Sequence, residues 1–487
     1  MGDITRVVKD RGLVHLGSGV APLERWCTPE GTSARTVGVR LGALVTIGWL
    51  GLIFTSIGAI SPWFVFLGLV AAWFSMRQWR WPLTVGSLWF HGIQLELGPM
   101  TIRLSQVGAV LLLILAMSYA GTAGRAWSRR TSRLVLLGAG WLIVELLSSI
   151  AFAPVPMASL WVWSQALLGC VLFLAISELD DDAKAAISRV SVLVGASTVM
   201  MSLIFAAWGF ALGIDRHDVP GFSSDGRLVG FSFEPNILAS SAVMWIVVVI
   251  CARGWFSTWE RWSVVPLLIG VVLSGTRAGW IALAVVGASY ALLVRGLLQR
   301  HLRLIVGSAA GLLIAWIVAA VAFWNTREDS ITWRIAHILD LRSATAGYRL
   351  DIYRTAISDL DRYDAWAVGL GTNSFSQRHL IDATSTGPAY LSSLFIALLY
   401  AGGVIGLMFF VAMKVELVRG SGRRLFTLLT VTAFIVCSLT TSVLWFSFVY
   451  VALAVSIPRS SPALEAARIR PGTRWVDKSI RRAAPRR

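Results

Sequence analysis

Three arginines stand in short polar segments that separate long hydrophobic runs. Arg227 opens the segment RLVGFSFEPN, Arg277 lies in SGTRAG, and Arg349 lies in the polar segment 325–388. A guanidinium group is planar and donates paired hydrogen bonds, which suits phosphate oxygens. If the fold brings the three segments together, they predict a site for a phosphate-bearing ligand, such as a lipid diphosphate at a bilayer surface. Arg277 could instead only anchor a helix end at the membrane interface.

Two side chains near these arginines are candidates for proton transfer. Glu234 is followed by Pro235 and Asn236, and proline is tolerated at the first turn of a helix, so Glu234 and Asn236 should lie at a helix start. A carboxylate at a dry interface can have a raised pKa and act as a general base. The alternative is that Glu234 and Asn236 only cap the helix. His379 is the second candidate, although a lone histidine is more often incidental.

The polar segment has helical character of its own. Arg349, Tyr353 and Ala356 recur at i, i+4 and i+7, so they share one helix face, and a Gly369-Leu-Gly371 turn follows. The exposed face of a soluble cap would look similar. The aspartates over 359–364 are typical of a solvated helix end, so we expect no metal site, and nothing in the sequence calls for a cofactor.

The composition indicates a polytopic membrane protein. The 487 residues are 56% hydrophobic and only 14% charged, and the mean hydropathy is +0.70. A spanning helix needs about 20 apolar residues, and we predict an all-α protein with about 12 transmembrane helices and a helical extracytoplasmic cap. The net charge of +17 then concerns orientation in the membrane and contact with lipids, and not nucleic acid. The four cysteines are far apart, and we expect no disulfide.

The arginine-rich loops predict the orientation, because such loops stay in the cytoplasm. They put 214–235 and 325–388 together on the far side of the membrane, as one composite site requires. Thirteen apolar runs and a cytoplasmic C-terminus would put the N-terminus outside the cell, whereas its basic residues predict that it is cytoplasmic. Either one run within 37–77 should therefore lie shallow in the membrane, or 81–103 should hide a further crossing. The expected parts are a cytoplasmic segment 1–36, helices over 37–324, the cap 325–388, helices over 389–457 and a basic cytoplasmic tail 458–487.

The order of these motifs resembles that of the O-antigen ligase and O-antigen/exopolysaccharide polymerase superfamily. The resemblance runs from about residue 100 to 457 and rests on R-x-x-GF-x-x-EPN, SGTRAG, R-x3-aromatic-x2-A and G-x-G. It implies a metal-independent GT-C-type membrane glycosyltransferase whose donor is an undecaprenyl-diphosphate-linked glycan. Arg227, Arg277 and Arg349 are the positions that match the family's diphosphate-binding arginines. Asn236, Tyr353, Gly369 and Gly371 would support them.

One departure favours the polymerase branch of this family. Family ligases have a His-Asn pair about eleven residues before a Gly-x-x-Gly, and this chain has Ser392-Ser393 there, before Gly403-Val-Ile-Gly406. We therefore expect a bacterial plasma-membrane enzyme that polymerises polyprenyl-diphosphate-linked repeats, with membrane lipids and a flippase or chain-length regulator as candidate partners. Ligase-like transfer to a cell-envelope acceptor is the alternative.

Three other classes fit the sequence less well. A glycolipid transporter would explain the apolar runs but not the large cap, and we find no internal repeat. A polyprenyl-monophosphate glycosyltransferase of the other GT-C branch would carry acidic residues in its first extracytoplasmic loop, and 94–100 offers only Glu96. A non-catalytic assembly protein would not need convergent arginines.

Overall fold

The computed structural model describes most of the hydrophobic part of the chain. The described residues are 45–51, 53–55, 60–76, 79–97, 100–120, 129–214, 219–223, 226–232, 234–294, 344–379, 390–421 and 423–458. The segment 1–36, nearly all of the tail 458–487, the apolar run 303–324 and the parts 325–343 and 380–388 of the cap range lie outside them. What we expect of those parts stays a prediction.

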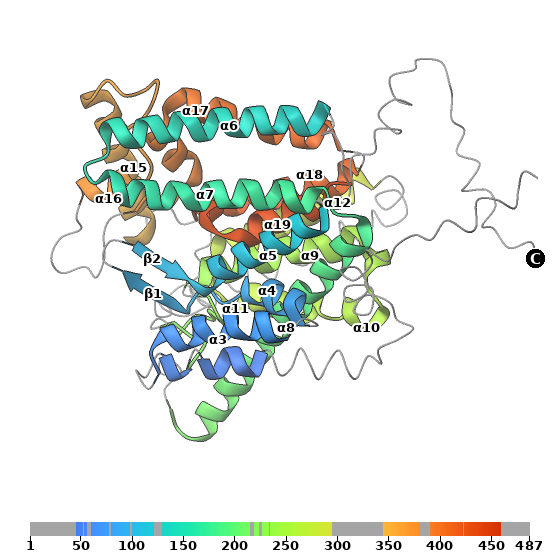
Figure 1. Ribbon diagram of the computed structural model, residues 1–487. Coiled ribbons are helices and arrows are strands. Elements are labelled where there is room, and N and C mark those ends of the chain that lie inside the picture. The colour runs from blue at the N-terminus through green and yellow to red at the C-terminus, as the bar shows by residue number, and fades with distance from the viewer. Residues whose placement is uncertain are drawn as a thin grey trace, which may run out of the picture.

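The protein is mostly helical, as the sequence predicts, and its helices fall on the expected apolar runs (Figure 1). In chain order they are α3 (Pro62–Ser75), α4 (Arg80–Ser87), α5 (Leu104–Ala120), α6 (Arg129–Phe152), α7 (Pro156–Ser177), α8 (Asp181–Ala211), α9 (Pro235–Cys251), α10 (Thr258–Arg261), α11 (Val264–Leu273), α12 (Arg277–Leu293), α15 (Ala344–Arg362), α16 (Ser374–Arg378), α17 (Leu394–Arg419), α18 (Arg424–Ser438) and α19 (Ser447–Val455).

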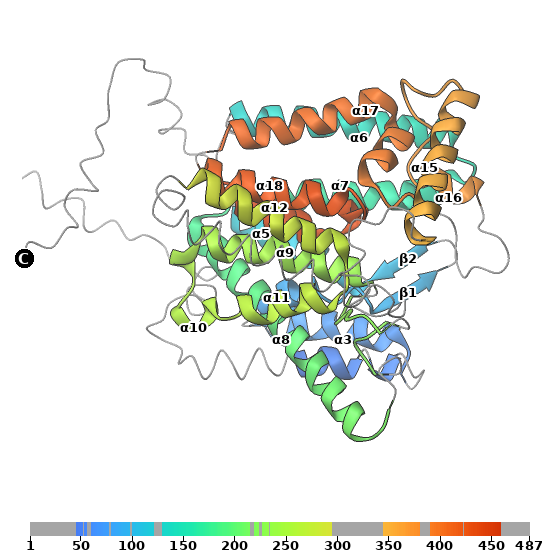
Figure 2. The ribbon, with the colours of Figure 1, turned by 180° about the vertical axis from the view of Figure 1, so that it is seen from behind.

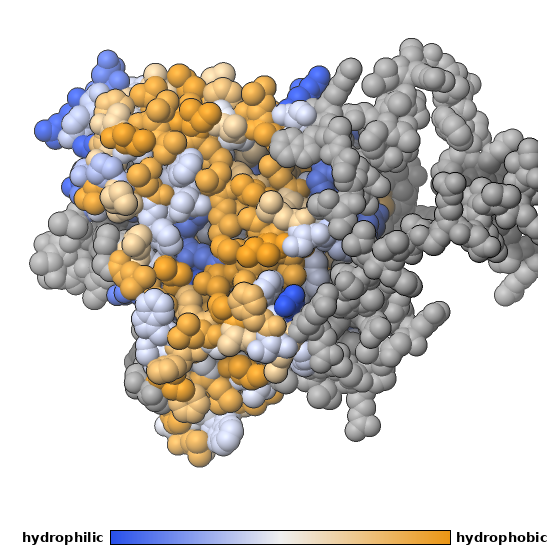
Figure 3. Space-filling model, in the orientation of Figure 1, coloured by the Kyte–Doolittle hydropathy of each residue, from blue (hydrophilic) through white to orange (hydrophobic). Residues whose placement is uncertain are grey.

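Four of the described helices, α6, α7, α8 and α17, are long and apolar enough to cross a membrane. Six further apolar helices are shorter: Val45–Thr55, α3, α5, α9, α12 and α18. Seen from one side, the middle of the molecule is largely hydrophobic, while hydrophilic residues gather at the end that carries α15 and α16 (Figure 3). These features indicate an integral membrane protein. The number of about twelve spans stays a prediction.

Helix α9 lies at the centre of the bundle. It packs against α8, α11, α12, α18 and α19, and its side chains from Ile237 to Val249 are buried. A helix that is apolar on every face must be surrounded in this way, because no side of it can form a polar surface. The N-terminus of α9, and Glu234 before it, are therefore held by the whole core.

Helix α17 is broken at Gly403, whose φ of 62° is not helical. The segment after α15 supplies the missing backbone partners. Leu370 N donates to Tyr400 O (2.6 Å) and Gly371 N to Ala401 O (3.1 Å), while Val404 N donates to Trp366 O (2.8 Å) and Ile405 N to Ala367 O (3.2 Å). A polar backbone group left unpaired in a membrane costs several kcal/mol. The segment 366–371 thus satisfies the backbone groups that the break in α17 leaves without helical partners.

A two-stranded hairpin, β1 (Gln94–Leu97) and β2 (Met100–Arg103), departs from the all-α expectation. The sequence analysis considered 81–103 only as a hidden crossing. The strand residues QLEL and MTIR alternate in character, and Gly98-Pro99 between them is typical of a turn, so a period-two pattern was present but short. Two opposite views show the hairpin at the same end of the bundle as α15 and α16 (Figures 1 and 2).

Replacing Gly369 by alanine tests the join between the cap segment and α17. Gly369 has a φ of +75°, and a Cβ there would lie 2.6 Å from backbone atoms of Ala401. Since strain at such a backbone position costs about 1–3 kcal/mol, Gly369→Ala should unfold at a clearly lower temperature than wild type in detergent.

Gly287→Ala is the matched control for this substitution. Gly287 lies in α12, and no atom is within 4 Å of a Cβ built there. That variant should unfold at the wild-type temperature or slightly above it, because alanine favours the helix. Equal unfolding temperatures for Gly369→Ala and Gly287→Ala would show that the join does not contribute to stability.

Candidate functional site

The N-terminus of α9 positions Glu234 at the surface of the central core. Pro235 is the first residue of the helix, and Glu234 precedes it in an extended conformation. The amide Nδ2 of Asn236 donates to Glu234 Oε1. The Glu234 side chain accepts no capping hydrogen bond from the helix backbone. Glu234 is therefore not a helix cap in the usual sense, and its carboxylate is oriented by Asn236.

Two of the sequence-predicted arginines lie within electrostatic reach of Glu234. Burial raises the pKa of Glu234, while the Asn236 hydrogen bond and then the charges of Arg349 and Arg227 lower it. The same arginines act on Tyr390, whose pKa is raised by lost hydration and by the Glu234 carboxylate. Arg227 and Arg349 come from segments more than 100 residues apart. The fold thus gathers a carboxylate, a phenol and two guanidinium groups at one place.

Arg277 is connected to the Arg227 segment through the hairpin that carries it. It is the first residue of α12, and the preceding turn is tied internally, since Ser274 Oγ donates to Val271 O at 2.7 Å. Leu228 N donates to Leu273 O at 3.0 Å, so the Arg227 segment is bonded to the end of α11 immediately before that turn. Arg227 and Arg277 are thereby carried by neighbouring backbone segments.

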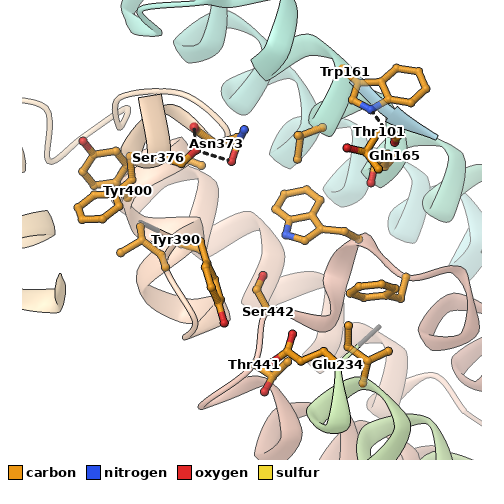
Figure 4. Close-up of a pocket in the computed structure, with 18 of the residues that line it drawn as sticks. Thr101, Trp161, Gln165, Glu234, Asn373, Ser376, Tyr390, Tyr400, Thr441 and Ser442 are labelled. Carbon is orange, nitrogen blue, oxygen red and sulfur yellow. Dashed lines mark hydrogen bonds between the residues drawn. The ribbon is translucent and has the colours of Figure 1, made fainter. Parts of the chain in front are cut away.

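A cavity of about 540 Å³ opens beside Glu234 (Figure 4). Its walls come from β2, α7, the start of α9, the Gly371–Ser376 segment, the start of α17 and the 441–446 segment. Glu234, Thr441 and Ser442 lie at one end and Trp161, Thr101 and Gln165 at the other, while Tyr390 lies to one side, toward Tyr400 (Figure 4). The lining includes Glu234 but none of the three arginines of the sequence analysis. Glu234 therefore stands between the arginines and the cavity.

Two hydroxyl groups in this cavity wall have no protein partner. Among the described residues, Thr441 Oγ1 and Ser442 Oγ are buried and make no hydrogen bond. Both residues line the cavity next to Glu234 (Figure 4). Leaving a buried hydroxyl without a hydrogen bond lowers the free energy of unfolding by about 1–3 kcal/mol. A bound ligand rich in hydroxyl groups could restore these bonds.

His379 belongs to a different network. One of its ring nitrogens, Nε2, lies 2.6 Å from Asp359 Oδ2, and Tyr400 Oη donates to the same oxygen at 2.8 Å. The ring of Phe375 packs 4.6 Å from the imidazole. Phe375 and Tyr400 line the cavity, whereas His379 does not. The structure therefore brings Glu234, Arg227 and Arg349 together, whereas His379 lies outside the cavity lining and joins the end of α16 to Asp359 of α15.

The predicted support residues hold the cap segment against the spanning helices. Tyr353 Oη and Ser392 Oγ share a hydrogen bond of 2.8 Å, which joins α15 to the start of α17. Gly371 has a φ of +98°, and a Cβ there would lie 2.8 Å from Ser149 Cα of α6. The Gly369–Gly371 turn can therefore pack closely against the spanning helices because its glycines have no side chain.

Just beyond this turn, Thr372 anchors the cavity wall inside the bundle. Thr372 Oγ1 donates to Oε2 of Glu145, a fully buried carboxylate of α6, at 3.2 Å. Trp141 Nε1 donates to Glu145 Oε1 at 2.8 Å. The sequence analysis missed Glu145, although a single acidic residue in an apolar run is a recognisable signal of function or structure. It also missed Tyr390 and Tyr400, for which the sequence carries no comparable signal. The expectation of a solvated helix end over 359–364 is wrong for Asp359, which is buried and hydrogen-bonded to Tyr400 and His379.

Among the residues that the structure describes, no three His, Cys, Asp or Glu side chains gather as metal ligands would. What the arrangement does offer is a set of fixed positive charges next to a carboxylate at the mouth of a hydroxyl-lined cavity. Such a set can hold an anionic group on one side and accept a proton on the other.

The chain carries one recognisable family domain. The sequence model of the family described as O-antigen ligase matches residues 262–411, from the end of α10 through α11, α12, α15 and α16 into α17. The matched part contains Arg277, Arg349 and the Gly369–Gly371 turn, while Arg227 and Glu234 precede it. No curated protein matches the chain significantly. This match agrees with the expectation from the motifs, and residues 262–411 are identified as an O-antigen ligase family domain.

Proposed function

We propose that this protein is a bacterial plasma-membrane polymerase that joins polyprenyl-diphosphate-linked oligosaccharide repeats. The family supports a membrane enzyme of glycosyl transfer that acts on a lipid-linked glycan. The observation that carries the finer proposal is the convergence of Arg227 and Arg349 on Glu234, at the mouth of a cavity lined by hydroxyl and aromatic groups.

The arginines hold the donor in this proposal. A diphosphate leaving group gains negative charge as its bond to the sugar breaks, and guanidinium groups fixed in advance stabilise that charge without reorganising. Arg349 and Arg227 both act on Glu234, and Arg277 follows a turn that is bonded to the Arg227 segment through α11. The three charges make a metal ion unnecessary for this role. The polyprenyl chain then lies along the apolar surface of the bundle.

Glu234 serves the acceptor. A hydroxyl of the second lipid-linked repeat attacks the anomeric carbon, its proton passes to the Glu234 carboxylate, and the polyprenyl diphosphate leaves. Because burial raises the pKa of Glu234, its carboxylate is a stronger base than an exposed glutamate. Asn236 keeps one carboxylate oxygen engaged, which orients the other toward the cavity.

Two observations favour polymerisation over transfer to a different acceptor. The position at which family ligases carry their histidine is held by Ser392, and Ser392 is engaged by Tyr353 of the cap. His379, the other candidate base, is engaged by Asp359 and does not line the cavity. The description of the matching family keeps ligase-like transfer to a cell-envelope acceptor as the second candidate.

Arginine-to-lysine substitutions test recognition of the diphosphate. Lysine keeps the charge but loses the planar pair of donors, so Arg277→Lys and Arg349→Lys should each lower polymer yield by about 10- to 100-fold, which corresponds to the loss of one charge-assisted hydrogen bond in the transition state. Polymer is measured by gel analysis of surface glycan in a deletion strain that expresses each variant at the wild-type level.

The control is Arg354→Lys on the same helix as Arg349. Arg354 is exposed and pairs with Asp351 at 2.9 Å, one turn away on the solvent side. This variant should keep wild-type polymer yield. If Arg277→Lys and Arg349→Lys do so as well, the arginines stabilise helix ends and do not bind a diphosphate.

An assay with one purified substrate separates the two candidate functions. Wild-type protein with a single lipid-linked repeat and no other acceptor should give a ladder of longer glycans. Glu234→Gln should suppress the ladder while donor binding stays near wild type, because the arginines remain. The wild-type rate should also fall on acidification at a higher pH than an ordinary glutamate would cause, since a base with a raised pKa is protonated earlier.

His379→Ala is the informative comparison in the same assay. It should retain most of the ladder, since His379 contacts Asp359 and not the cavity. Product that forms only after a chemically different acceptor is added would establish the ligase alternative. Loss of that product in His379→Ala, with retention in Glu234→Gln, would assign the base to His379.

A further inference from the structure

The end of the cavity away from Glu234 has its own chemical character. Thr101 of β2 and Trp161 and Gln165 of α7 line it, and Arg103, which also lines the cavity, is two residues after Thr101 on the same strand. Figure 4 shows Trp161, Thr101 and Gln165 together at this end, on the far side of the cavity from Glu234. In the surface view, a hydrophilic patch lies between α7 and the hairpin within an otherwise hydrophobic face (Figure 3). The proposed reaction uses none of these side chains.

Arg103 brings a positive charge into this part of the cavity wall. Its guanidinium carbon lies 5.6 Å from the centre of the Phe446 ring, which also lines the cavity. The backbone holds the residue in place, because Arg103 N donates to Gln106 Oε1 at 2.8 Å. Burial lowers the pKa of Arg103, so water stabilises its charge less than at an exposed site. A guanidinium group in a cavity wall can donate charge-assisted hydrogen bonds to a carboxylate or phosphate on a ligand.

Aromatic rings surround the space between Arg103 and Glu234. Trp161 and Trp445 line the cavity from α7 and the 441–446 segment, and Tyr390 lines it from the side of Tyr400 (Figure 4). Trp161 is held by a hydrogen bond from Nε1 to Thr101 O at 3.3 Å. Ligand sites usually combine such apolar and aromatic walls with a few placed polar groups. Flat rings with free hydroxyl and amide groups between them suit the faces and hydroxyls of sugars.

We propose that this cavity binds the acceptor glycan and that Arg103 requires an anionic group, a carboxylate or a phosphate, on one of its sugars. The inference rests on the proposed function. The assignment to the acceptor follows from the lining, which contains the proposed base Glu234 but not the three arginines that would hold the donor diphosphate. The reacting hydroxyl lies at Glu234, Thr441 and Ser442, and the anionic sugar lies at Arg103 and Gln165.

The probe is the protein's own glycan. A deletion strain should accumulate a lipid-linked repeat, from which mild acid releases the free oligosaccharide. Chemical analysis of that oligosaccharide should find a uronic acid, another acidic sugar or a phosphate substituent. Carbodiimide activation followed by borohydride then reduces carboxylates, and hydrogen fluoride removes phosphate. These two treatments distinguish the two sources of negative charge.

Binding of the native and the neutralised oligosaccharide to detergent-purified protein tests the role of Arg103. Wild type should bind the native form about 10- to 100-fold more tightly than the form that has lost its anionic group, as one charge-assisted hydrogen bond implies. Arg103→Gln should bind both forms equally and weakly. Arg133→Gln, at an exposed position whose side chain is 70% accessible, should keep the wild-type preference.

Two further variants keep the test informative if Arg103→Gln folds poorly. Gln165→Glu adds a carboxylate at the same end, so it should weaken binding of the native form and leave the neutral form unchanged. Thr441→Val acts at the other end and should weaken both forms alike. An accumulated repeat that is neutral, equal wild-type affinity for both forms, or a retained preference in Arg103→Gln would each overturn the proposal.

The same experiments separate this inference from the proposed function. If no lipid-linked glycan accumulates in the deletion strain, glycan polymerisation itself is wrong. If a repeat accumulates and wild type extends it, but the repeat is neutral or Arg103→Gln still discriminates, polymerisation stands and only the anionic subsite is wrong.

Discussion

The structure around the site depends on a break in a membrane helix. A spanning helix normally satisfies all of its backbone groups internally, and α17 does not, because Gly403 turns the chain out of the helical conformation. The segment 366–371 supplies the partners, with four backbone hydrogen bonds across the break. The cap is therefore not a separate lobe on a loop. Its segment 366–371 completes α17 and joins the end of α15 to that helix.

A second anchor runs deeper into the bundle. Thr372 reaches Glu145, a fully buried carboxylate of α6 that also accepts from Trp141. A charge or a polar group in such surroundings must be hydrogen-bonded or it destabilises the fold. Thr372 and Trp141 supply these hydrogen bonds. The bond from Thr372 also holds the residues that precede α16 against Glu145. One wall of the cavity is thus tied to a helix that crosses the membrane, and the opposite wall is the rigid start of α9.

Features that depend on local sequence patterns could be predicted, and features that depend on contacts between segments mostly could not. The helices follow the apolar runs, because hydrophobic length is read locally. Arg227, Arg349 and Glu234 could be expected together because charge asymmetry assigns loops to one side of the membrane. The hairpin β1–β2, the break at Gly403 and the pairing of His379 with Asp359 could not. The hairpin is local, but its alternating pattern spans only four residues in each strand. The break at Gly403 and the pairing of His379 depend on contacts between separate segments, and a single glycine or histidine does not identify its partner.

The join between the cap and α17 also has an evolutionary consequence. It is made by main-chain atoms of Trp366, Ala367, Leu370 and Gly371, so most side chains along it can change without breaking a bond. Only the positive-φ glycines at 369, 371 and 403 restrict which residue can occupy their positions. Homologous chains could drift far apart in this region while the geometry persists. These few glycines, more than overall sequence similarity, would then identify the architecture in homologous chains.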